Sequence, residues 1–313
     1  MDSIPLGQSD LVSSRLAYGC WRLGGSTEIA EITEEGAMRG GAAVVAAYDA
    51  GFTLFDLADV YCDGICETIV GQVLAQVAGM REKILIATKC GIRKKGEPYT
   101  DSPYRYDFSG EHIVKSCEDS LRRLGIETID LFQLHRPDYL CDPVEVAEAF
   151  SKLKAQGKAR EFGVSNFRPA QFSLLQKFCP MPLLVNQVEI SLASLDCFHN
   201  GTLDHCLMEN ITPLAWSPLD GGRLGSVAKS TKAAPHPVQM KLLEALDAIG
   251  EERGTSRTAI ALAWLLKHPS RIVPIIGATN PDNIREAVKS TEITLTREEW
   301  YRLLEAARGD RLP

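Results

Sequence analysis

This sequence lacks an excess of basic charge, long apolar runs and an ordered cysteine pattern. The 313-residue chain carries 34 Lys and Arg against 41 Asp and Glu, a formal net charge of −7. Nucleic-acid-binding proteins carry a basic stripe, and an acidic balance argues against that class. No uninterrupted apolar run approaches 18 residues, so no transmembrane helix is expected. We therefore expect neither nucleic acid nor membrane among the partners of this chain.

The N-terminus and the cysteines indicate a compartment. The first residues, MDSIPLGQSD, contain no basic segment and no apolar segment, so a secretory signal peptide is not expected. Nine scattered cysteines are typical of a reducing cytosol rather than of a disulfide framework. Cys62 and Cys66 lie close in sequence but lack a matching second pair, and we interpret them as coincidental. These features predict a cytoplasmic protein.

Short apolar runs with β-branched residues alternate with longer segments of helical periodicity. The predicted strands are Arg15–Gly19, Phe52–Asp56, Lys83–Lys89, Thr128–His135, Glu161–Ser165, Leu183–Gln187, Ile211–Trp216 and Arg271–Ile276. The predicted helices are Ile32–Ala50, Glu67–Ala78, Glu111–Leu124, Asp142–Gln156, Pro169–Phe178, Leu203–Glu209, Pro237–Glu252, Ser256–Lys267 and Thr296–Arg308. Strands that are apolar on both faces and alternate with helices indicate a parallel sheet covered by helices.

Eight such units predict an α/β protein with a single domain, a (β/α)₈ TIM barrel spanning residues 1–313. In this fold, function lies at the carboxyl ends of the strands. A doubly wound open sheet is the alternative, but a dinucleotide-binding version carries G-x-G-x-x-G after its first strand, and that spacing is absent. A short N-terminal hairpin is expected across Ser3–Arg15, with Leu6 and Leu11 flanking the turn and plugging the bottom of the barrel.

Polar side chains end the predicted strands, and a barrel brings them to one mouth. A buried lysine at Lys89 needs an acidic partner, because an unpaired buried charge is costly, and Asp56 is available. The cation beside Tyr61 is expected to lower the phenol pKa from about 10, which makes Tyr61 a proton donor. His135 would orient a substrate oxygen or relay a proton.

Taken singly, each of these residues has an ordinary structural explanation, as a cap, a solvated charge or a packed ring. Together on consecutive strands they predict the addition of a proton to a carbonyl oxygen. None of them can supply a hydride, so a redox reaction requires a nicotinamide cofactor. Ser165, Asn166 and Gln187 offer donors and acceptors for its carboxamide, and Trp216 offers a flat surface for its ring.

The strand-end motifs resemble those of the aldo-keto reductase superfamily from about Arg15 to Arg308. They are D-x-x-x-x-Y at Asp56–Tyr61, TKCG around Lys89, LFQLHRPD around His135, GVSNF at Gly163–Phe167, NQVE at Asn186–Glu189 and WSPLDGG at Trp216–Gly222. The stretches YGCWRL, ADVYCDGICE and AWSPLDGGRLG are similar to those of the bacterial YdhF-type oxidoreductases. The resemblance implies an NAD(P)H-dependent reductase of aldehydes or ketones, with Tyr61 as general acid supported by Asp56, Lys89 and His135.

The resemblance also implies a cofactor-binding set. Its residues at the nicotinamide and pyrophosphate are Cys20, Trp21, Asp56, Ser165, Asn166, Gln187, Trp216, Ser217, Pro218, Leu219, Gly221, Gly222 and Arg223. Those at the adenosine end are Gly277, Thr279, Asn283 and Glu286. NADP(H) is the expected cofactor and NAD(H) the alternative, because Gly277 and Asn283 stand where many members carry cations for the 2′-phosphate. Many members also have an asparagine where this chain has Ala287.

Three functions remain open at this point. The first is a free-standing reductase, working as a monomer or a small homo-oligomer. The second is a nicotinamide-binding regulatory subunit, as the potassium-channel β-subunits of the superfamily imply. The third is a metal-dependent lyase or isomerase using Asp56, His135 and Glu189, although no zinc-type ligand cluster is evident. The long loop Cys90–Gly110 is rich in basic residues and tyrosines. It indicates one of two things: a binding site for a carbonyl substrate that is a sugar or an anion, or a solvated basic loop.

Overall fold

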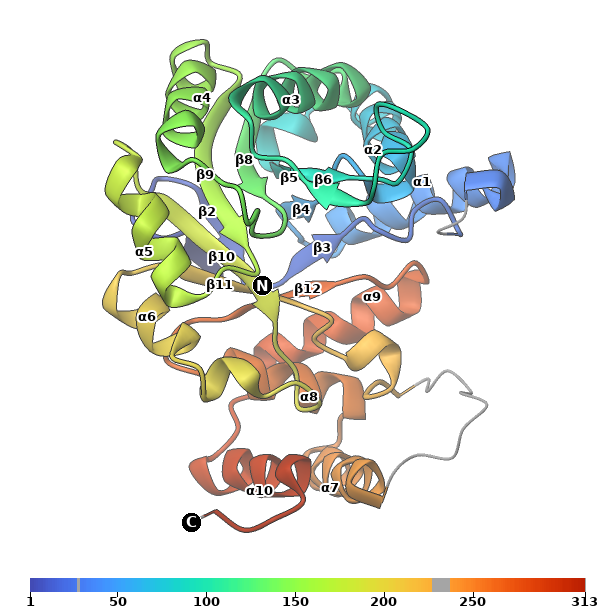
Figure 1. Ribbon diagram of the computed structural model, residues 1–313. Helices are drawn as coiled ribbons and strands as arrows, with labels where there is room; N and C mark the ends of the chain where they lie inside the picture. Colours follow the sequence, from blue (N-terminus) through green and yellow to red (C-terminus); the bar gives the residue numbers. More distant parts are fainter. Residues whose placement is uncertain (27–28, 227–236, 313) are drawn as a thin grey trace.

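The computed structural model describes residues 1–26, 29–226 and 237–312. Within them, parallel strands close into a barrel in the order of the chain (Figure 1). The barrel strands are β3 (Ala17–Gly19), β4 (Leu54–Asp56), β5 (Leu85–Cys90), β8 (Ile129–Leu134), β9 (Ala159–Ser165), β10 (Leu183–Glu189), β11 (Thr212–Trp216) and β12 (Val273–Ile276). The predicted TIM barrel is confirmed, and the open sheet was the wrong alternative.

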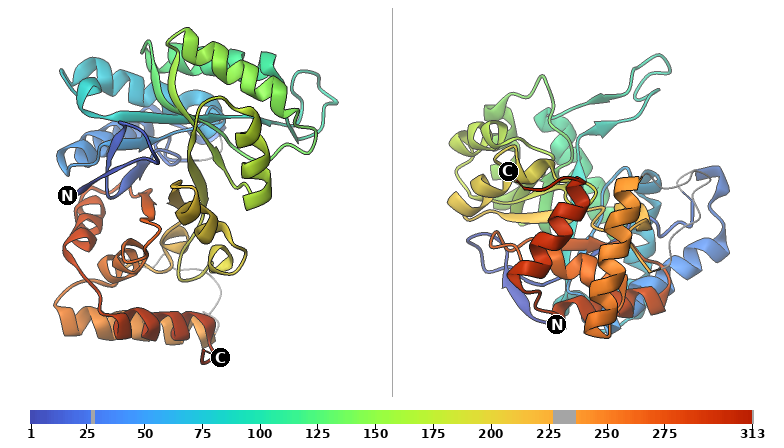
Figure 2. Two further views of the ribbon diagram at one scale, coloured as in Figure 1. Left: turned by 90° about the vertical axis from the view of Figure 1, so that its left-hand side faces the viewer. Right: turned by 90° about the horizontal axis from the view of Figure 1, so that it is seen from below.

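Helices surround the barrel (Figure 1). They are α1 (Glu34–Asp49), α2 (Ile65–Gln76), α3 (Gly110–Leu124), α4 (Pro143–Ala155), α5 (Pro169–Phe178), α6 (Thr202–Met208), α7 (Pro237–Arg253), α8 (Arg257–Leu266), α9 (Pro281–Val288) and α10 (Arg297–Arg308). Helices α7 and α10 lie side by side, outside the ring of helices that directly covers the strands (Figure 2, left).

Local sequence explains where several helices begin and end. The Asp142 side chain accepts a hydrogen bond from the backbone N–H of Val144, and Pro143 fills the first turn of α4. Ser109 caps α3 in the same way, and Gly125 ends α3 in the left-handed conformation that glycine adopts without strain. These signals place the helices that return the chain to the start of each next strand.

The barrel lumen is filled by alternate residues of the strands. Its lower layers are apolar and come from Ala17, Leu54, Ala87, Leu131, Val185, Leu214, Val273 and Ile275. The strands β1 (Ser3–Pro5) and β2 (Val12–Ser14) form the expected N-terminal hairpin. Its Leu6 and Leu11 are buried in the same cluster, so the hairpin plugs the bottom of the barrel as predicted.

Two segments differ from the expectation. The predicted loop Cys90–Gly110 contains a small hairpin, β6 (Ile92–Arg93) with β7 (Arg105–Tyr106), which projects at the end of the molecule opposite the N-terminus (Figure 2, right). Helix α9 was not predicted, because eight residues with few apolar positions give little periodicity. The sequence feature that indicates the start of α9 is the N-cap residue Asn280 followed by Pro281.

Candidate active site

A buried ion pair forms the base of the mouth. Lys89, at the end of β5, is fully buried, and its Nζ lies 2.8 Å from Oδ2 of Asp56 at the end of β4. Nζ also donates to the carbonyl oxygen of Leu57 at 2.6 Å and to Oη of Tyr61 at 3.2 Å. An ammonium has three protons, so these contacts account for all its donors. The predicted grouping of Asp56, Lys89 and Tyr61 is therefore present in the structure.

The second oxygen of Asp56 is also occupied. Nε2 of Gln187, from β10 on the far side of the lumen, donates to Oδ1 of Asp56 at 2.7 Å. Both carboxylate oxygens of Asp56 thus accept a hydrogen bond from a buried side chain, one from Lys89 and one from Gln187. The described ranges contain no group of three or more His, Cys, Asp and Glu side chains that could hold a metal ion.

The protonation of Tyr61 differs in direction from the prediction. Burial raises the pKa of the phenol, the Lys89 charge lowers it, and burial prevails, so the pKa lies above 10 rather than below it. Burial likewise opposes the charge of Lys89, but Asp56 and Tyr61 raise the Lys89 pKa above its ordinary value. At neutral pH the Tyr61 phenol is therefore protonated and lies beside the charged Lys89 ammonium. In this arrangement the phenol is suited to donating its proton.

His135 follows β8 and faces the same phenol. The rings of His135 and Tyr61 have centroids 5.8 Å apart in an edge-to-face arrangement. Burial, with the charges of Lys89 and Arg136, lowers the His135 pKa well below 6.5. The imidazole is therefore neutral at physiological pH, and one of its nitrogens carries a proton while the other accepts.

The residues predicted for the nicotinamide form a connected set beside this pair. The Ser165 hydroxyl donates to the carbonyl oxygen of Gln187 at 2.8 Å, and the Asn166 amide donates to Ser165 Oγ at 2.8 Å. Oδ1 of Asn166 accepts from Nε1 of Trp216 at 3.0 Å, and Asn166 itself has a left-handed φ of 63°. These bonds hold the amide and the indole in place before any ligand arrives.

The donor set fits a carboxamide-bearing aromatic ring. The Gln187 amide nitrogen is held by Asp56, which leaves Oε1 as an acceptor for an N–H group. The indole of Trp216 presents a face, over which the Arg136 guanidinium lies 5.5 Å from the ring centroid. Trp21, half-exposed, extends the mouth with its ring 6.5 Å from that of Tyr61, whereas the Cys20 side chain is fully buried.

The segment after β11 has the backbone freedom that close approach to a phosphate requires. Gly221 and Gly222 have φ of 65° and 100°, and a Cβ on either would meet nothing within 4 Å. Ser217 also has a left-handed φ of 50°, and Pro218 and Leu219 follow it. The Arg223 guanidinium lies against Asp220, with Nε 2.6 Å from Oδ2.

The predicted adenosine residues lie at β12 and α9. Gly277 and Thr279 are exposed after β12, and Asn283 is half-buried on α9. The Glu286 carboxylate accepts from the Ser226 hydroxyl at 2.8 Å, which ties α9 to the segment after β11. Arg285 pairs with Asp282 at 2.6 Å on the exposed side of α9.

One buried polar residue of the lumen is not among the residues predicted from the sequence. Gln133 lies two residues before His135 on β8, and its side chain is fully buried. The signal was available, because strand alternation places positions 133 and 135 on the same face.

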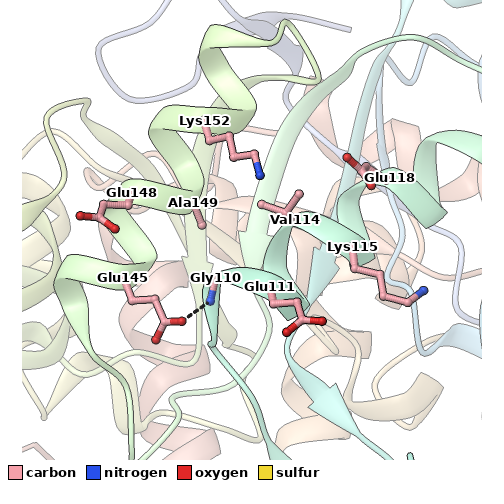
Figure 3. A pocket seen from close by; sticks show the side chains of 9 residues that line it. All are labelled: Gly110, Glu111, Val114, Lys115, Glu118, Glu145, Glu148, Ala149 and Lys152. Carbon is pink, nitrogen blue, oxygen red and sulfur yellow. Dashed lines mark hydrogen bonds between the residues drawn. The ribbon is translucent and has the colours of Figure 1, made fainter.

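A surface hollow of about 510 Å³ between α3 and α4 (Figure 3) contains none of the predicted site residues, and Glu145 there accepts from the backbone N–H of Gly110 at 2.8 Å.

Comparison with known proteins agrees with this geometry. The pattern that defines the aldo/keto reductase family matches residues 15–308. The chain belongs to the aldo/keto reductase family. It is 41% identical to a 6-dehydroglucose reductase of Novosphingobium aromaticivorans, over 98% of this chain and 96% of that protein. It is 39% identical to the oxidoreductase YdhF of Escherichia coli, over 85% of this chain and 86% of that one.

The reductase fold extends to solved structures. The glycerol dehydrogenase of Gluconobacter oxydans superimposes with a TM-score of 0.86 at 29% identity, covering 100% of this chain and 98% of that structure. The expected resemblance to the superfamily and to the YdhF-type proteins is confirmed. Family membership and these relatives support carbonyl reduction as the chemistry of the aldo/keto reductase described here. None of its helices in the described ranges is long and apolar enough to cross a membrane.

Proposed function

We propose that this aldo/keto reductase is an NADP(H)-dependent enzyme that reduces an aldehyde or ketone to an alcohol, or catalyses the reverse. The observation that carries the proposal is the hydrogen-bonded series Asp56–Lys89–Tyr61, with the neutral ring of His135 beside it. The carboxamide acceptors and the Trp216 face lie next to this series. The same face of the barrel therefore holds both a proton donor and a surface for a nicotinamide ring.

Each residue has a distinct part in the proposed reaction. When bound, the nicotinamide supplies the hydride that no side chain provides. Tyr61 Oη donates its proton to the carbonyl oxygen as that oxygen gains charge, and Lys89 Nζ stabilises the phenolate that remains. Asp56 keeps Lys89 charged. The neutral His135 donates an N–H to the same oxygen and orients the carbonyl.

The substrate class we propose is a hydroxylated aldehyde. Two relatives that share 41% and 39% identity with this chain are named 6-dehydroglucose reductases. At the mouth, the half-buried Arg136 guanidinium stacks on Trp216, and Arg22 lies 5.9 Å from the ring of Trp21. Guanidinium donors beside indole faces suit a polyhydroxylated chain, because hydroxyls accept the N–H groups while C–H groups pack on the rings.

Tyr61→Phe tests the proposal. Removing the hydroxyl is expected to lower kcat at least about 100-fold, the lower range for general acid catalysis, without loss of NADPH binding. The assay follows NADPH oxidation with a panel of hydroxylated, simple and aromatic aldehydes. Tyr48→Phe, on the outer helix α1, is the matched control and should retain wild-type turnover.

Two outcomes would contradict the proposal. A Tyr61→Phe enzyme with kcat within about twofold of wild type would remove Tyr61 from the role of general acid. A wild-type protein that binds NADPH but turns over no aldehyde, ketone or alcohol in the panel would instead favour the regulatory subunit.

A further inference from the structure

Two buried polar groups in the barrel lumen have no hydrogen-bond partner within the described ranges. They are the side-chain amide of Gln133, at both Nε2 and Oε1, and Nδ1 of His135. Gln133 is fully buried, and His135 retains only 8% of its exposure. Buried polar groups are almost always paired with protein or with ordered water, so each of these atoms calls for a physical explanation.

The neighbouring polar groups cannot satisfy them. Lys89, opposite Gln133 in the β5–β8 register, uses all three donors on Asp56, Leu57 and Tyr61. On the other neighbour, β9, Gln133 pairs in register with Gly163, which has no side chain to offer. Neither in-register neighbour of Gln133 therefore offers its amide a free polar group.

Strand geometry brings the unpaired groups near each other. Leu131 of β8 belongs to the lumen core, whereas Phe132 and Leu134 pack among the outer helices. Alternation then places Gln133 and His135 on the lumen face with Leu131, with Cα atoms roughly 6.6 Å apart. One water molecule can bridge a glutamine amide and an imidazole at that Cα spacing, and Nε2 and Oε1 of Gln133 with Nδ1 of His135 supply three polar atoms to hold it.

We propose that Gln133 positions His135 through a water molecule bound between them in the lumen. The Gln133 amide N–H donates to the water oxygen, and a water O–H donates to Nδ1 of His135. A neutral imidazole that accepts at Nδ1 carries its proton on Nε2. Gln133 thereby sets the tautomer that directs an N–H of His135 toward the mouth, and it acts as a positioning residue without touching the substrate.

This inference rests on the proposed reductase function for its consequence, but the water site and the tautomer are properties of the free protein. Without the bridge, no hydrogen bond to Nδ1 holds the imidazole in the Nε2–H form, and the Nδ1–H form becomes more populated. A substrate oxygen then meets an acceptor nitrogen in part of the molecules. The reduction step should slow while cofactor binding is unaffected.

Gln133→Met tests the inference, because methionine has a similar volume and cannot bind the water. Histidine labelled with ¹⁵N reports the tautomer by NMR, and His135→Asn identifies the His135 signals among the six histidines. We expect wild-type His135 to be in the Nε2–H form, and Gln133→Met to shift the population toward Nδ1–H. Turnover should fall about 3- to 10-fold, the range expected for one neutral hydrogen bond.

The tautomer of the same variant separates positioning from a structural role. Gln133→Met removes one partner of the bridge and leaves Nδ1 of His135 buried, so the urea midpoint should fall modestly, whereas a shift of the His135 tautomer is a change that a merely structural role would not produce. Leu131→Met, two residues earlier on the same face, controls for repacking of β8 and should leave tautomer and kcat unchanged.

Three results would overturn the inference. The first is an Nε2–H population that Gln133→Met does not change. The second is a kcat that stays within about twofold of wild type. The third is a high-resolution crystal structure in which no water contacts Nδ1. Because the NMR measurement needs no turnover, it remains decisive even if Tyr61→Phe shows that the proposed function is wrong.

Discussion

At the residue scale, the balance between burial and charge decides the state of each titratable group at the mouth. Residue types and spacing alone predict that the charge of Lys89 lowers the Tyr61 pKa. The structure adds desolvation, which outweighs the cation and raises that pKa. The phenol therefore keeps its proton over the whole physiological range, as the proposed general acid requires, and under that proposal Lys89 stabilises the anion formed once the proton has left.

Asp59, between Asp56 and Tyr61 in sequence, is a second group controlled by burial. Its Oδ2 accepts from the Ser116 hydroxyl, and its Oδ1 has no partner in the described part of the chain. Burial raises the Asp59 pKa to about 7, against smaller lowering effects from Ser116 and Arg123. The carboxyl is therefore about half ionised at neutral pH, although it lies directly in the loop that carries Tyr61.

Asp59→Asn should flatten the pH dependence of stability. A carboxyl whose pKa is raised by folding contributes fully below its unfolded pKa near 4, and that contribution is lost as pH rises through about 7. The free energy of unfolding of Asp59→Asn should therefore fall less than that of wild type between pH 5 and pH 8. Urea unfolding at each pH measures this. Equal slopes for the two proteins would show that Asp59 is not perturbed.

At the element scale, α9 carries Asn283 and Glu286, two residues that we expect at the adenosine end of the cofactor. Its first turn is capped by Asn280, and its exposed side carries the Asp282–Arg285 pair. An exposed pair of this kind contributes little to stability, so Arg285 is free to turn toward another anion. This is the cation nearest in sequence to Asn283, the position at which the resemblance to the superfamily implies an arginine for the 2′-phosphate in many members.

We expect NADPH to bind more tightly than NADH, and Arg285→Ala to reduce that difference. A charged hydrogen bond to a phosphate contributes about 1.5–3 kcal/mol, or roughly 10- to 150-fold in affinity. Fluorescence titration of tryptophan quenching with both cofactors measures it. Arg297→Ala, on α10, should change neither constant. Equal or tighter NADH binding by wild type would mean that Gly277 and Asn283 decide the preference.

At the scale of the whole molecule, the N-terminal hairpin plugs the bottom of the barrel. Leu6 and Leu11 of the N-terminal hairpin cover the bottom of the lumen, and the backbone N–H of Gly7 donates to Thr212 at 2.8 Å. The proposed catalytic groups lie at the opposite end of the same lumen, above its apolar layers. We therefore expect stability and catalysis to depend on different ends of the barrel.

Leu6→Ala should destabilise the fold while leaving the chemistry of the folded protein largely intact. Removal of a fully buried leucine costs about 2–5 kcal/mol, because it leaves a cavity. Urea unfolding measures the loss, and kcat at low temperature should stay within about twofold of wild type. Leu174→Ala, at a residue that is 55% exposed on α5, is the control and should change little. A large loss of kcat would show that the plug also shapes the mouth.

The sequence by itself determined the barrel and the residues at its mouth. Strands that are apolar on both faces and alternate with capped helices are compatible with few other folds. Polar residues at the strand ends converge because the carboxyl ends of parallel strands share one edge. The sequence therefore predicts that Asp56, Tyr61 and Lys89 lie together. It does not predict the β6–β7 hairpin or α9, because short elements with few apolar positions carry little periodicity.

Only the tertiary structure decided how these residues are partnered and charged. Whether Asp56 has an oxygen to spare depends on Gln187 from the opposite wall, 131 positions away in sequence. The pKa of Tyr61 and the isolation of Gln133 depend on how completely neighbouring elements exclude water. The desolvation of a side chain depends on all the elements that pack around it, and a hydrogen bond depends on the distance between two atoms in space. Neither can be predicted from residue types and sequence spacing alone.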